Sequence, residues 1–403
     1  MRKFRFKWQL IATIILIVIV SLTISCGSRN VTVTWDSVQQ PVLSSNFKLK
    51  VYIENSGSMD GYMCNGSELK DAVYSYASAL SSYADTTELN YINSRVISYG
   101  NEIKSFIRDL TPQRFRAAGG NRSNSDIAKM FEDILNQTDD NTISIFVSDC
   151  ILDVPNGDAK DFFENRSIDI RNTFTQHLNQ YADLGVEIFR LESSFEGHYY
   201  YSYGSEKLKD VKRPYYMWVI GNKNILAHVN KQVPFSEIRH GVKNYFAFST
   251  NSIIPFEITN TKSMARGNQC TPTKNAYGEY EFLVKTNLHS TLQGNDILCS
   301  SVNYNTLTSN IKVESVAEIS SSSSFTHIIN VVIENASKSF AERIILKPLY
   351  APSWLEDVND DSGTNIRSNM DKTTGIKYLV QGVADAYKKQ EQLAEFKFVI
   401  SNR

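Results

Sequence analysis

The sequence has no excess of positive charge, and this absence excludes one broad class of partner. Its 403 residues include 42 Lys and Arg against 43 Asp and Glu, so the formal net charge is -1. A general nucleic-acid binder needs a basic surface that neutralises phosphates. We therefore expect no nucleic-acid partner. A net charge near zero also gives no indication of long-range steering toward a charged ligand.

Signatures of common enzymes and of zinc sites are missing as well. The chain has no GxSxG elbow, Walker A loop or HExxH helix; none of its five cysteines has CxxC spacing, and its six histidines are scattered. Ser67 and Lys70 have the SxxK spacing of some serine acyl enzymes, but the accompanying SDN and KTG elements are lacking. We interpret Ser67 as a helix cap and Lys70 as a solvated lysine. The chain is not expected to be an enzyme.

What the sequence does have is enough apolar material for a folded core. Hydrophobic residues make up 42% and aromatic residues 11% of the chain, which is typical of globular proteins. The length favours two domains, with three as the alternative.

The first 25 residues have the features of an export signal. A basic stretch over residues 2–7 precedes an apolar run over residues 8–24, and Ser25, Cys26 and Gly27 follow. This stretch resembles a bacterial lipoprotein signal, which implies that residues 1–25 are removed and that Cys26 carries a lipid anchor. We expect a location in the cell envelope, at the outer membrane of a Gram-negative bacterium. An uncleaved anchor is the alternative, and both readings place the rest of the chain outside the cytoplasm.

Between residues 46 and 245, strand patterns alternate with helix patterns. Apolar alternation over 47–53 and a nearly continuous apolar run over 143–149 indicate strands, the second buried on both faces. Further strands are expected at 95–99, 186–191 and 215–222, and helices at 69–83, 127–135, 170–181 and 225–233. This order predicts an α/β domain with a doubly wound, mostly parallel sheet and helices on both faces. Ligands of such sheets bind at the carboxyl ends of the strands.

Two other segments accompany this domain. Residues 26–45 are polar without a strong period and suit a tether. The stretch 193–213 is too long for a minimal connection, so we expect an insertion near the ligand edge. It contains Tyr199, Tyr200 and Tyr201, which are candidate ligand contacts because tyrosine gives a large contact area at low entropy cost. Ordinary packing of an edge strand is the alternative for these tyrosines.

From residue 246 to residue 403 the helical period largely disappears. Apolar strand patterns follow one another with polar connections, which predicts an all-β, sandwich-like domain. One late helix is expected over 376–387, and residues 320–324 are expected to form a loop between strands.

Polar side chains in three separate loops form the constellation that points to chemistry. Glu54, Ser56 and Ser58 follow the first strand, Ser125 precedes a helix that it could cap, and Asp149 ends the buried strand. Carboxylate and hydroxyl oxygens are hard ligands of the kind that Mg²⁺ prefers. The alternative is a purely structural role, since Ser, Asn, Asp and Gly are also the residues that tight strand-to-helix turns prefer.

Over residues 46–245 these loops resemble the von Willebrand factor A family, whose metal-ion-dependent adhesion site uses Asp-x-Ser-x-Ser, a Thr and an Asp in this order. Ser56 and Ser58 match the hydroxyl ligands, while Glu54 stands where the family has Asp. Ser125 is the best match for the Thr, with Ser123 second. Asp149, in VSDC, matches a loop that often reads Asp-Gly. The resemblance implies bound Mg²⁺ or Mn²⁺ that engages an acidic group.

Because disulfides persist in oxidising compartments, the predicted export makes disulfides between the remaining four cysteines an option. Cys64 follows the first loop and Cys150 follows Asp149, so these two could form a disulfide if the loops converge. Cys270 and Cys299 could then pair in the β domain. Four unpaired thiols are the alternative.

The sequence therefore predicts a lipid-anchored extracytoplasmic binding protein that engages an acidic group of a protein partner through a divalent cation. The main alternative is a metal-independent structural component of a cell-envelope assembly. A metal-dependent hydrolase, with Asp149 and Glu54 as the only visible bases, is the third class.

Overall fold

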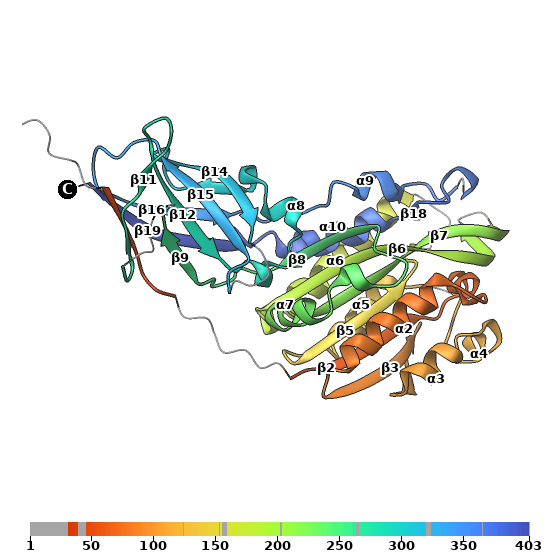
Figure 1. Cartoon of the computed structure of the whole chain (residues 1–403). Coiled ribbons are helices and arrows are strands. Elements are labelled where there is room, and N and C mark those ends of the chain that lie inside the picture. The colour runs from red at the N-terminus through yellow and green to blue at the C-terminus, as the bar shows by residue number, and fades with distance from the viewer. Residues whose placement is uncertain are drawn as a thin grey trace, which may run out of the picture.

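The computed structural model of the chain contains two sheet-based units, an α/β unit and a β-sandwich unit (Figure 1). It describes residues 31–38, 46–123, 125–152, 154, 159–201, 204–260, 262, 266–319, 324–364 and 366–402. The predicted signal peptide and Cys26 lie outside these ranges. None of the helices within them is long and apolar enough to cross a membrane.

A seven-stranded sheet with strand order β4-β3-β2-β5-β7-β6-β8 forms the centre of the α/β unit. Its strands are β2 (Lys48–Glu54), β3 (Thr86–Ile92), β4 (Val96–Gly100), β5 (Thr142–Ser148), β6 (Leu184–Tyr201), β7 (Gly204–Asn222) and β8 (Asn244–Ser249). Every residue of β5 is buried, as the apolar run predicted. Strand β2 is parallel to both of its neighbours, β3 and β5. All other neighbouring pairs of this sheet are antiparallel.

The prediction of a mostly parallel sheet is therefore wrong, and the sheet is mixed. The cause is the hairpin formed by β6 and β7, whose second strand lies between β5 and β6. A hairpin reverses the chain, so the strand that it inserts is antiparallel to both neighbours. The expected insertion over 193–213 is the outer part of this hairpin, which continues as paired strands beyond the rest of the sheet (Figure 1).

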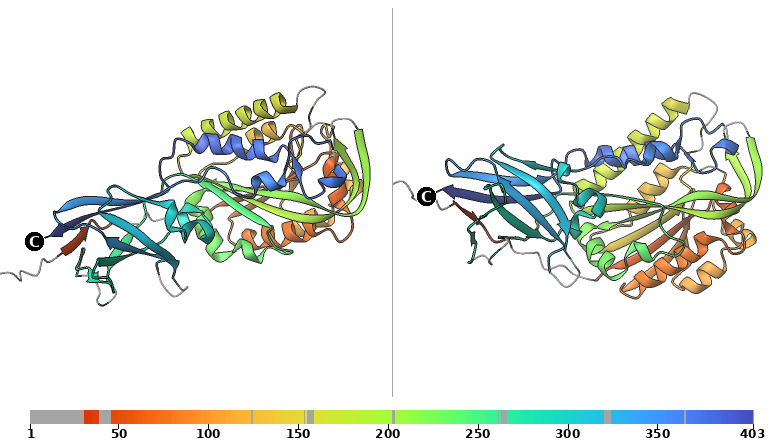
Figure 2. Two further views of the ribbon diagram at one scale, coloured as in Figure 1. Left: turned by 90° about the horizontal axis from the view of Figure 1, so that it is seen from above. Right: turned by 45° about the horizontal axis from the view of Figure 1, so that its top comes forward.

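Helices cover both faces of the sheet, as predicted (Figure 2). One face packs against α2 (Glu68–Ser81), α3 (Ile103–Arg108), α4 (Pro112–Arg116) and α7 (Lys223–Gln232). The other face packs against α5 (Ile127–Leu135), α6 (Ala159–Gln180) and α10 (Ile376–Tyr387). The short 3-10 helices η1 (Ser58–Met63) and η2 (Phe235–Glu237) complete the unit.

The late helix α10 belongs to the α/β unit and not to the β domain in which it was expected. Its apolar residues, among them Leu379 and Val383, share a core with Phe163 and Ile170 of α6. The chain leaves the β-sandwich for this excursion, which also contains α9 (Leu355–Val358), β17 (Asn359–Asp360), η5 (Ile366–Ser368) and β18 (Thr373–Thr374). The helical period identified an amphipathic helix but could not identify which apolar surface it covers.

At Gly382, α10 approaches α6 closely, and this position provides a test of the packing. A Cβ atom at this position would lie 2.6 Å from the Ser167 carbonyl oxygen and 2.8 Å from Ile170 Cβ. Gly382→Leu should therefore separate the helices and lower the free energy of unfolding by about 1–3 kcal/mol. Urea denaturation measures the loss, and Gln381→Leu at the half-buried neighbouring position is the control. Equal midpoints for the two variants would contradict the packing.

The β-sandwich unit has two sheets around one apolar core, as predicted. The first sheet contains β10 (Gln269–Cys270), β1 (Val31–Trp35), β19 (Ala394–Asn402), β16 (Phe340–Leu346) and β13 (Tyr304–Thr306). The second contains β11 (Thr273–Lys274), β12 (Tyr280–Thr286), β15 (His327–Ile333) and β14 (Ile311–Glu318), with β9 (Phe256–Thr259) paired to β12. Short helical turns connect them: η3 (His289–Thr291), α8 (Asn295–Leu298) and η4 (Ser301–Asn303).

The structure corrects the two predicted boundaries of this unit. Residues 31–35, expected within a tether, form β1 and pair along their whole length with β19, because Val31, Val33 and Trp35 are buried in the sandwich core. Residues 246–249, expected to start the β domain, belong to β8 and pair with β6 in the α/β sheet. The sandwich is thus built from both ends of the described chain.

Candidate functional site

The five predicted ligand residues lie at the carboxyl ends of β2 and β5. These two strands are parallel neighbours in register, with Ile53 opposite Val147, so the loops that follow them start side by side. The loop before α5 reaches the same place, because Ser125 Oγ donates a hydrogen bond of 2.7 Å to Glu54 Oε1. The structure therefore brings together all three loops of the sequence pattern.

Glu54 is fully buried and is held by hydroxyl groups. Ser125 donates to one carboxylate oxygen and Ser148, the last residue of β5, donates to the other. Ser125 does not cap α5 as expected; the Asp126 side chain does so by accepting from Lys129 N at 3.2 Å. Ser123, the second match, donates instead to Asn121 Oδ1 at 2.6 Å. Ser125 is therefore free of the helix end and is oriented toward the carboxylate.

Asp149 is the second buried carboxylate, and one of its oxygens has no partner. Asp149 Oδ1 accepts a 3.3 Å hydrogen bond from Ile151 N, whereas Oδ2 has no hydrogen bond within the described part of the chain. Ser56 Oγ and Ser58 Oγ lie 2.9 Å apart. The Ser58 hydroxyl favours the ionised form of Asp149, and the Ser56 hydroxyl favours that of Glu54. An unpaired buried carboxylate oxygen is costly unless a further ligand satisfies it.

The two carboxyl groups hold protons more tightly than usual. Burial, and then the charge of Glu54, raise the pKa of Asp149 to about 7, against the weaker effects of Ser58 and Arg213. Burial likewise raises the pKa of Glu54, although three hydroxyls favour its charged form. A neutralising positive charge nearby would favour ionisation of both groups, because each ionised carboxylate disfavours ionisation of the other. A divalent cation would provide that charge.

The backbone after Asp149 takes a conformation that favours glycine. Cys150 has φ of 56° in the left-handed region, which is strained for a residue with a side chain. Two contacts hold it there: Cys150 N donates to Ser148 Oγ at 2.7 Å, and Trp218 Nε1 contacts Cys150 Sγ at 3.2 Å. This turn redirects the chain immediately after Asp149.

A cavity of about 500 Å³ opens at this edge of the sheet. It is lined by one arginine and by hydroxyl-bearing, apolar and glycine residues from five parts of the chain: Ser56, Gly57, Ser58, Arg122, Ser123, Ser125, Ile151, Leu152, Val154, Tyr200, Gly204, Ser205, Gly363 and Thr374. This size is within the range of ligand pockets.

The three candidate tyrosines of the hairpin differ in position. Tyr200 lines the cavity with 47% of its surface exposed. Tyr199 is instead buried: its ring lies 4.4 Å from the Arg213 guanidinium carbon, and its hydroxyl is 3.3 Å from Thr374 Oγ1. The prediction of a ligand contact is wrong for Tyr199, because successive residues of a strand face opposite sides. The side chain of Tyr201 lies outside the described part.

Sequence reasoning missed the residues that the C-terminal excursion and the hairpin bring to the site. Gly363 and Thr374 line the cavity. Arg213 of β7 is buried and donates to the carbonyl oxygens of Asn369 and Met370, at 3.2 and 2.8 Å. No local pattern signals these residues, because they approach the site only through tertiary packing.

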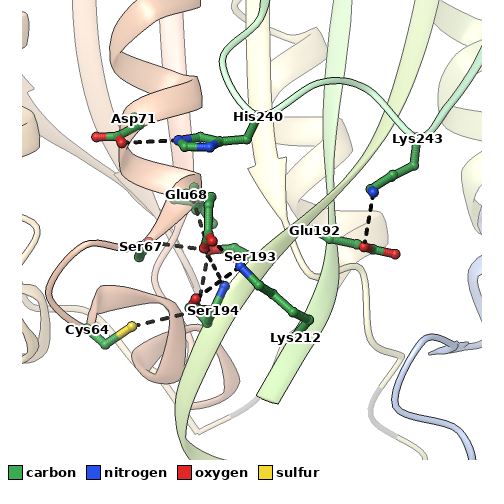
Figure 3. A network of polar contacts seen from close by, with 11 residues as sticks. Cys64, Ser67, Glu68, Asp71, Glu192, Ser193, Ser194, Lys212, His240 and Lys243 are labelled. Atoms are coloured by element: carbon green, nitrogen blue, oxygen red, sulfur yellow. Dashed lines mark hydrogen bonds and ion pairs between the residues drawn. The ribbon is translucent and has the colours of Figure 1, made fainter. Parts of the chain in front are cut away.

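The SxxK motif forms no serine–lysine pair. Lys70 Nζ donates to the Met63 carbonyl oxygen at 2.8 Å, so it is not the solvated lysine that was expected. Ser67 occupies the N-cap position of α2 without a capping hydrogen bond, and Ser193 of β6 accepts from Leu69 N at 3.1 Å instead. Ser67 belongs to the polar network of Figure 3, which connects α2 to the hairpin.

Glu68 is the centre of that network. It accepts from Ser194 N at 2.7 Å and pairs with Lys212, so one carboxylate joins the start of α2 to both strands of the hairpin. Burial alone would raise the pKa of Glu68, but the hydrogen bonds from Lys212 and Ser194 outweigh it and lower the pKa to about 2.

Glu68→Gln should therefore destabilise the protein in a pH-dependent way. The folded state has the lower pKa, so the stabilisation is present above about pH 4.5 and is lost as the pH falls toward 2. We expect a loss of about 1–2 kcal/mol at neutral pH, allowing for solvent screening. Urea denaturation between pH 2 and 7 measures it, with Glu164→Gln, an exposed ion-pair residue of α6, as the control. A difference from wild type that grows toward pH 2 would contradict the assignment.

The predicted disulfides are not present. Cys64, Cys150, Cys270 and Cys299 are all free thiols. Cys64 Sγ lies 3.7 Å from the Ser194 carbonyl oxygen of β6, while Cys150 is buried on the opposite side of the sheet, with Trp218. The loops converge, but these two side chains turn away from each other. Cys270 is buried in the sandwich core.

Comparisons of the chain with protein-family models, with curated proteins and with solved structures gave no match. Function therefore has to be argued from the chemistry of the site. Within the described ranges, no three His, Cys, Asp or Glu side chains are grouped so that they could hold a metal ion. A cation at this site would depend on hydroxyl oxygens together with the two carboxylates.

Proposed function

We propose that the α/β unit is a von Willebrand factor A-like binding domain that engages an acidic group of a protein partner through a divalent cation. The observation that carries the proposal is the buried, unpartnered Oδ2 of Asp149, which lies in a cluster of two carboxyls and three hydroxyls. A buried anionic oxygen without a partner suits a cation ligand.

The donor set fits Mg²⁺ or Mn²⁺. All its atoms are hard oxygens, and these ions prefer such ligands. Ser56, Ser58 and Ser125 would hold the ion, with Glu54 and Asp149 orienting its waters. When bound, the ion supplies a positive centre with a position for a carboxylate oxygen. Glu54 is one methylene longer than the family's Asp, and the hydrogen bonds from Ser125 and Ser148 fix where its carboxylate lies.

Two further features support the resemblance. The three loops occur in the family's order and meet at the ends of neighbouring parallel strands. The left-handed backbone at Cys150 stands where the family's loop often has Gly after Asp, and glycine is the residue that adopts this conformation without strain.

The cellular setting of the proposal rests on the sequence. The apolar run and Cys26 resemble a lipoprotein signal, so we propose a lipid anchor and a place in the cell envelope, at the outer membrane of a Gram-negative bacterium. The unit that follows such an anchor is the β-sandwich, since β1 begins at Val31.

A metal-independent structural component of a cell-envelope assembly is the second candidate. It is favoured by the hydrogen bonds that Glu54 already makes to Ser125 and Ser148, which satisfy both its oxygens without an ion. Under this reading the loops serve only to connect strands to helices. A metal-dependent hydrolase would need turnover that disappears on chelation.

Calorimetric titration of the chelator-treated protein with Mg²⁺ and Mn²⁺ tests the proposal. We expect saturable binding to wild type that is lost in Ser58→Ala, because this substitution removes a hydroxyl at the centre of the cluster. Ser123→Ala is the matched control, since Ser123 lines the cavity but bonds to Asn121. Absence of heat with wild type would remove the cation mechanism and make the structural role the leading one.

A further inference from the structure

The cavity is lined by two chemically different sets of residues. One set carries the hydroxyls of Ser56, Ser58 and Ser125, where the cation is proposed. The other set is the apolar wall of Ile151, Leu152 and Val154, with 9%, 2% and 6% of their surfaces exposed. A ligand that fills this space meets a polar end and an apolar wall at once.

Hydrogen bonds hold the start of the apolar wall next to Asp149, the carboxylate that precedes it in the chain. Ile151 N donates to Asp149 Oδ1 at 3.3 Å, and Leu152 N donates to the Thr374 carbonyl oxygen at 3.0 Å. The same short segment therefore sets the position of Asp149 and of the wall. Because these hydrogen bonds hold the segment, the positions of the carboxylate and of the apolar residues after it are fixed relative to each other.

Tyr200 provides a third, aromatic side from the hairpin. The residue facing it is Gly57, where a Cβ atom would lie 3.3 Å from Tyr200 Cε2. The tyrosine ring therefore approaches the backbone of the first loop, directly beside Ser56 and Ser58. Aromatic rings in pockets contribute a large apolar contact area.

A positive charge also borders the polar end. The Arg122 guanidinium donates to the Ser56 carbonyl oxygen at 2.8 Å and pairs with Asp60, so it is held in place at the cavity edge. A ligand carboxylate at this end would be favoured by this fixed cation as well as by a bound metal ion.

We propose that the cavity selects a carboxylate carried on an apolar body, such as an aliphatic or aromatic acid. This inference rests on the proposed cation site, because the ion would receive the carboxylate. A cavity of about 500 Å³ is unnecessary for capturing an acidic side chain on a flat protein surface, whereas it matches the size of pockets that bind small ligands. The same chemistry is offered by a free acid and by the C-terminus of a peptide that ends in an apolar residue.

Titration calorimetry of the whole protein with three small-molecule probes tests this selectivity. N-acetyl-leucine has both features, N-acetyl-leucine amide lacks the charge, and N-acetylglycine lacks the apolar body. In Mg²⁺ we expect N-acetyl-leucine to bind at least about tenfold more tightly than either of the other two. A hexapeptide ending in Leu, compared with its C-terminal amide, distinguishes the sources: tighter binding of the peptide acid than of N-acetyl-leucine indicates a chain end, and equal or weaker binding indicates a free acid.

Tyr200→Ala separates the pocket from the cation site. We expect this variant to lose about tenfold in affinity for N-acetyl-leucine with unchanged Mg²⁺ binding. Tyr74→Ala, which removes a similarly exposed tyrosine from α2, should change neither. Retained Mg²⁺ binding also shows that the variant is folded.

The outcomes distinguish the two proposals. Mg²⁺ binding without discrimination among the three probes would overturn the selection and leave the cation site standing. Selective binding of N-acetyl-leucine that is unaffected by Tyr200→Ala would place the apolar body elsewhere and overturn the assignment of the cavity. Absence of Mg²⁺ binding would overturn both.

Discussion

Asp149→Asn is expected to raise the stability of the cation-free protein and to abolish the effect of Mg²⁺ on it. Asp149 is buried and its Oδ2 has no partner in the described structure, so its ionised form is destabilising above about pH 7. Asn removes the charge at nearly the same volume, and its amide can still accept from Ile151 N. The gain should be about 1–3 kcal/mol, because a buried charge costs more than a neutral amide at the same place.

Thermal denaturation at pH 8, in chelator and in Mg²⁺, measures both effects. Wild type should melt at a higher temperature in Mg²⁺, since a ligand that binds only the folded state stabilises it. The variant should melt at the same temperature in both. Asp140→Asn, at an exposed position, is the control and should behave as wild type. A variant that is less stable than wild type in chelator would show that the Asp149 charge is already compensated.

In the absence of divalent cations, the free energy of unfolding should fall as the pH rises from about 4.5 to 7. Asp149 and Glu187 are both fully buried acids whose pKa values are raised to about 7, chiefly by burial. Glu187 accepts from Asn230 at 2.8 Å and Tyr245 at 2.7 Å, but its Oε2 lacks a partner in the described structure. In this range the folded state binds more protons than the unfolded state, so stability decreases with pH. Each pKa unit corresponds to about 1.4 kcal/mol, which makes the effect large.

Urea denaturation at intervals from pH 4.5 to 8 in chelator gives the slope. Glu187→Gln should reduce the slope and leave the Mg²⁺ response intact. Glu187 contacts Asn230 of α7 and Tyr245 of β8, on the face of the sheet opposite to that of Cys150 and Trp218. Asp149→Asn should reduce the slope and remove the response. Stability that rises over this range would contradict the raised pKa values of both groups.

The parts of the fold that the sequence predicted are those that depend on local periodicity. The apolar run of β5 and the helical spacing of α2, α5 and α7 are strong signals because each element buries a regular set of its own side chains. The direction of β7 was not predictable in this way. A strand has the same apolar pattern whether its neighbours run parallel or antiparallel, and the hairpin between β6 and β7 is formed by residues that resembled a loop.

The second feature that the sequence did not predict is which distant element each strand or helix packs against. Val31–Trp35 alternates as a strand does, but five residues between polar segments are a weak signal, and only pairing with β19 far along the chain makes it a strand. Likewise α10 was recognised as amphipathic, while its contact with α6 comes from the tertiary fold.

The candidate site likewise contains residues that local sequence patterns predicted and residues that they did not. Glu54, Ser58 and Asp149 follow predicted strands, and the carboxyl ends of neighbouring parallel strands must meet, so their approach followed from the fold. Thr374, which lines the cavity, and Arg213, whose charge acts on Asp149, could not be predicted because the excursion and the hairpin bring them to the site. The expected Cys64–Cys150 bond was wrong because adjacent loops do not determine which side of a sheet their side chains face.

The pairing of β1 with β19 has a mechanical consequence. Val31 lies opposite Asn402 and Trp35 opposite Phe398, at the end of the molecule away from the β6–β7 hairpin (Figure 1). A pull on the chain at Val31 along the axis of β1, resisted by the rest of the molecule, would load the hydrogen bonds to β19 together in shear and would not open them one at a time. The pairing is thus suited to resist a force along the axis of β1, at the end of the molecule opposite the β6–β7 hairpin.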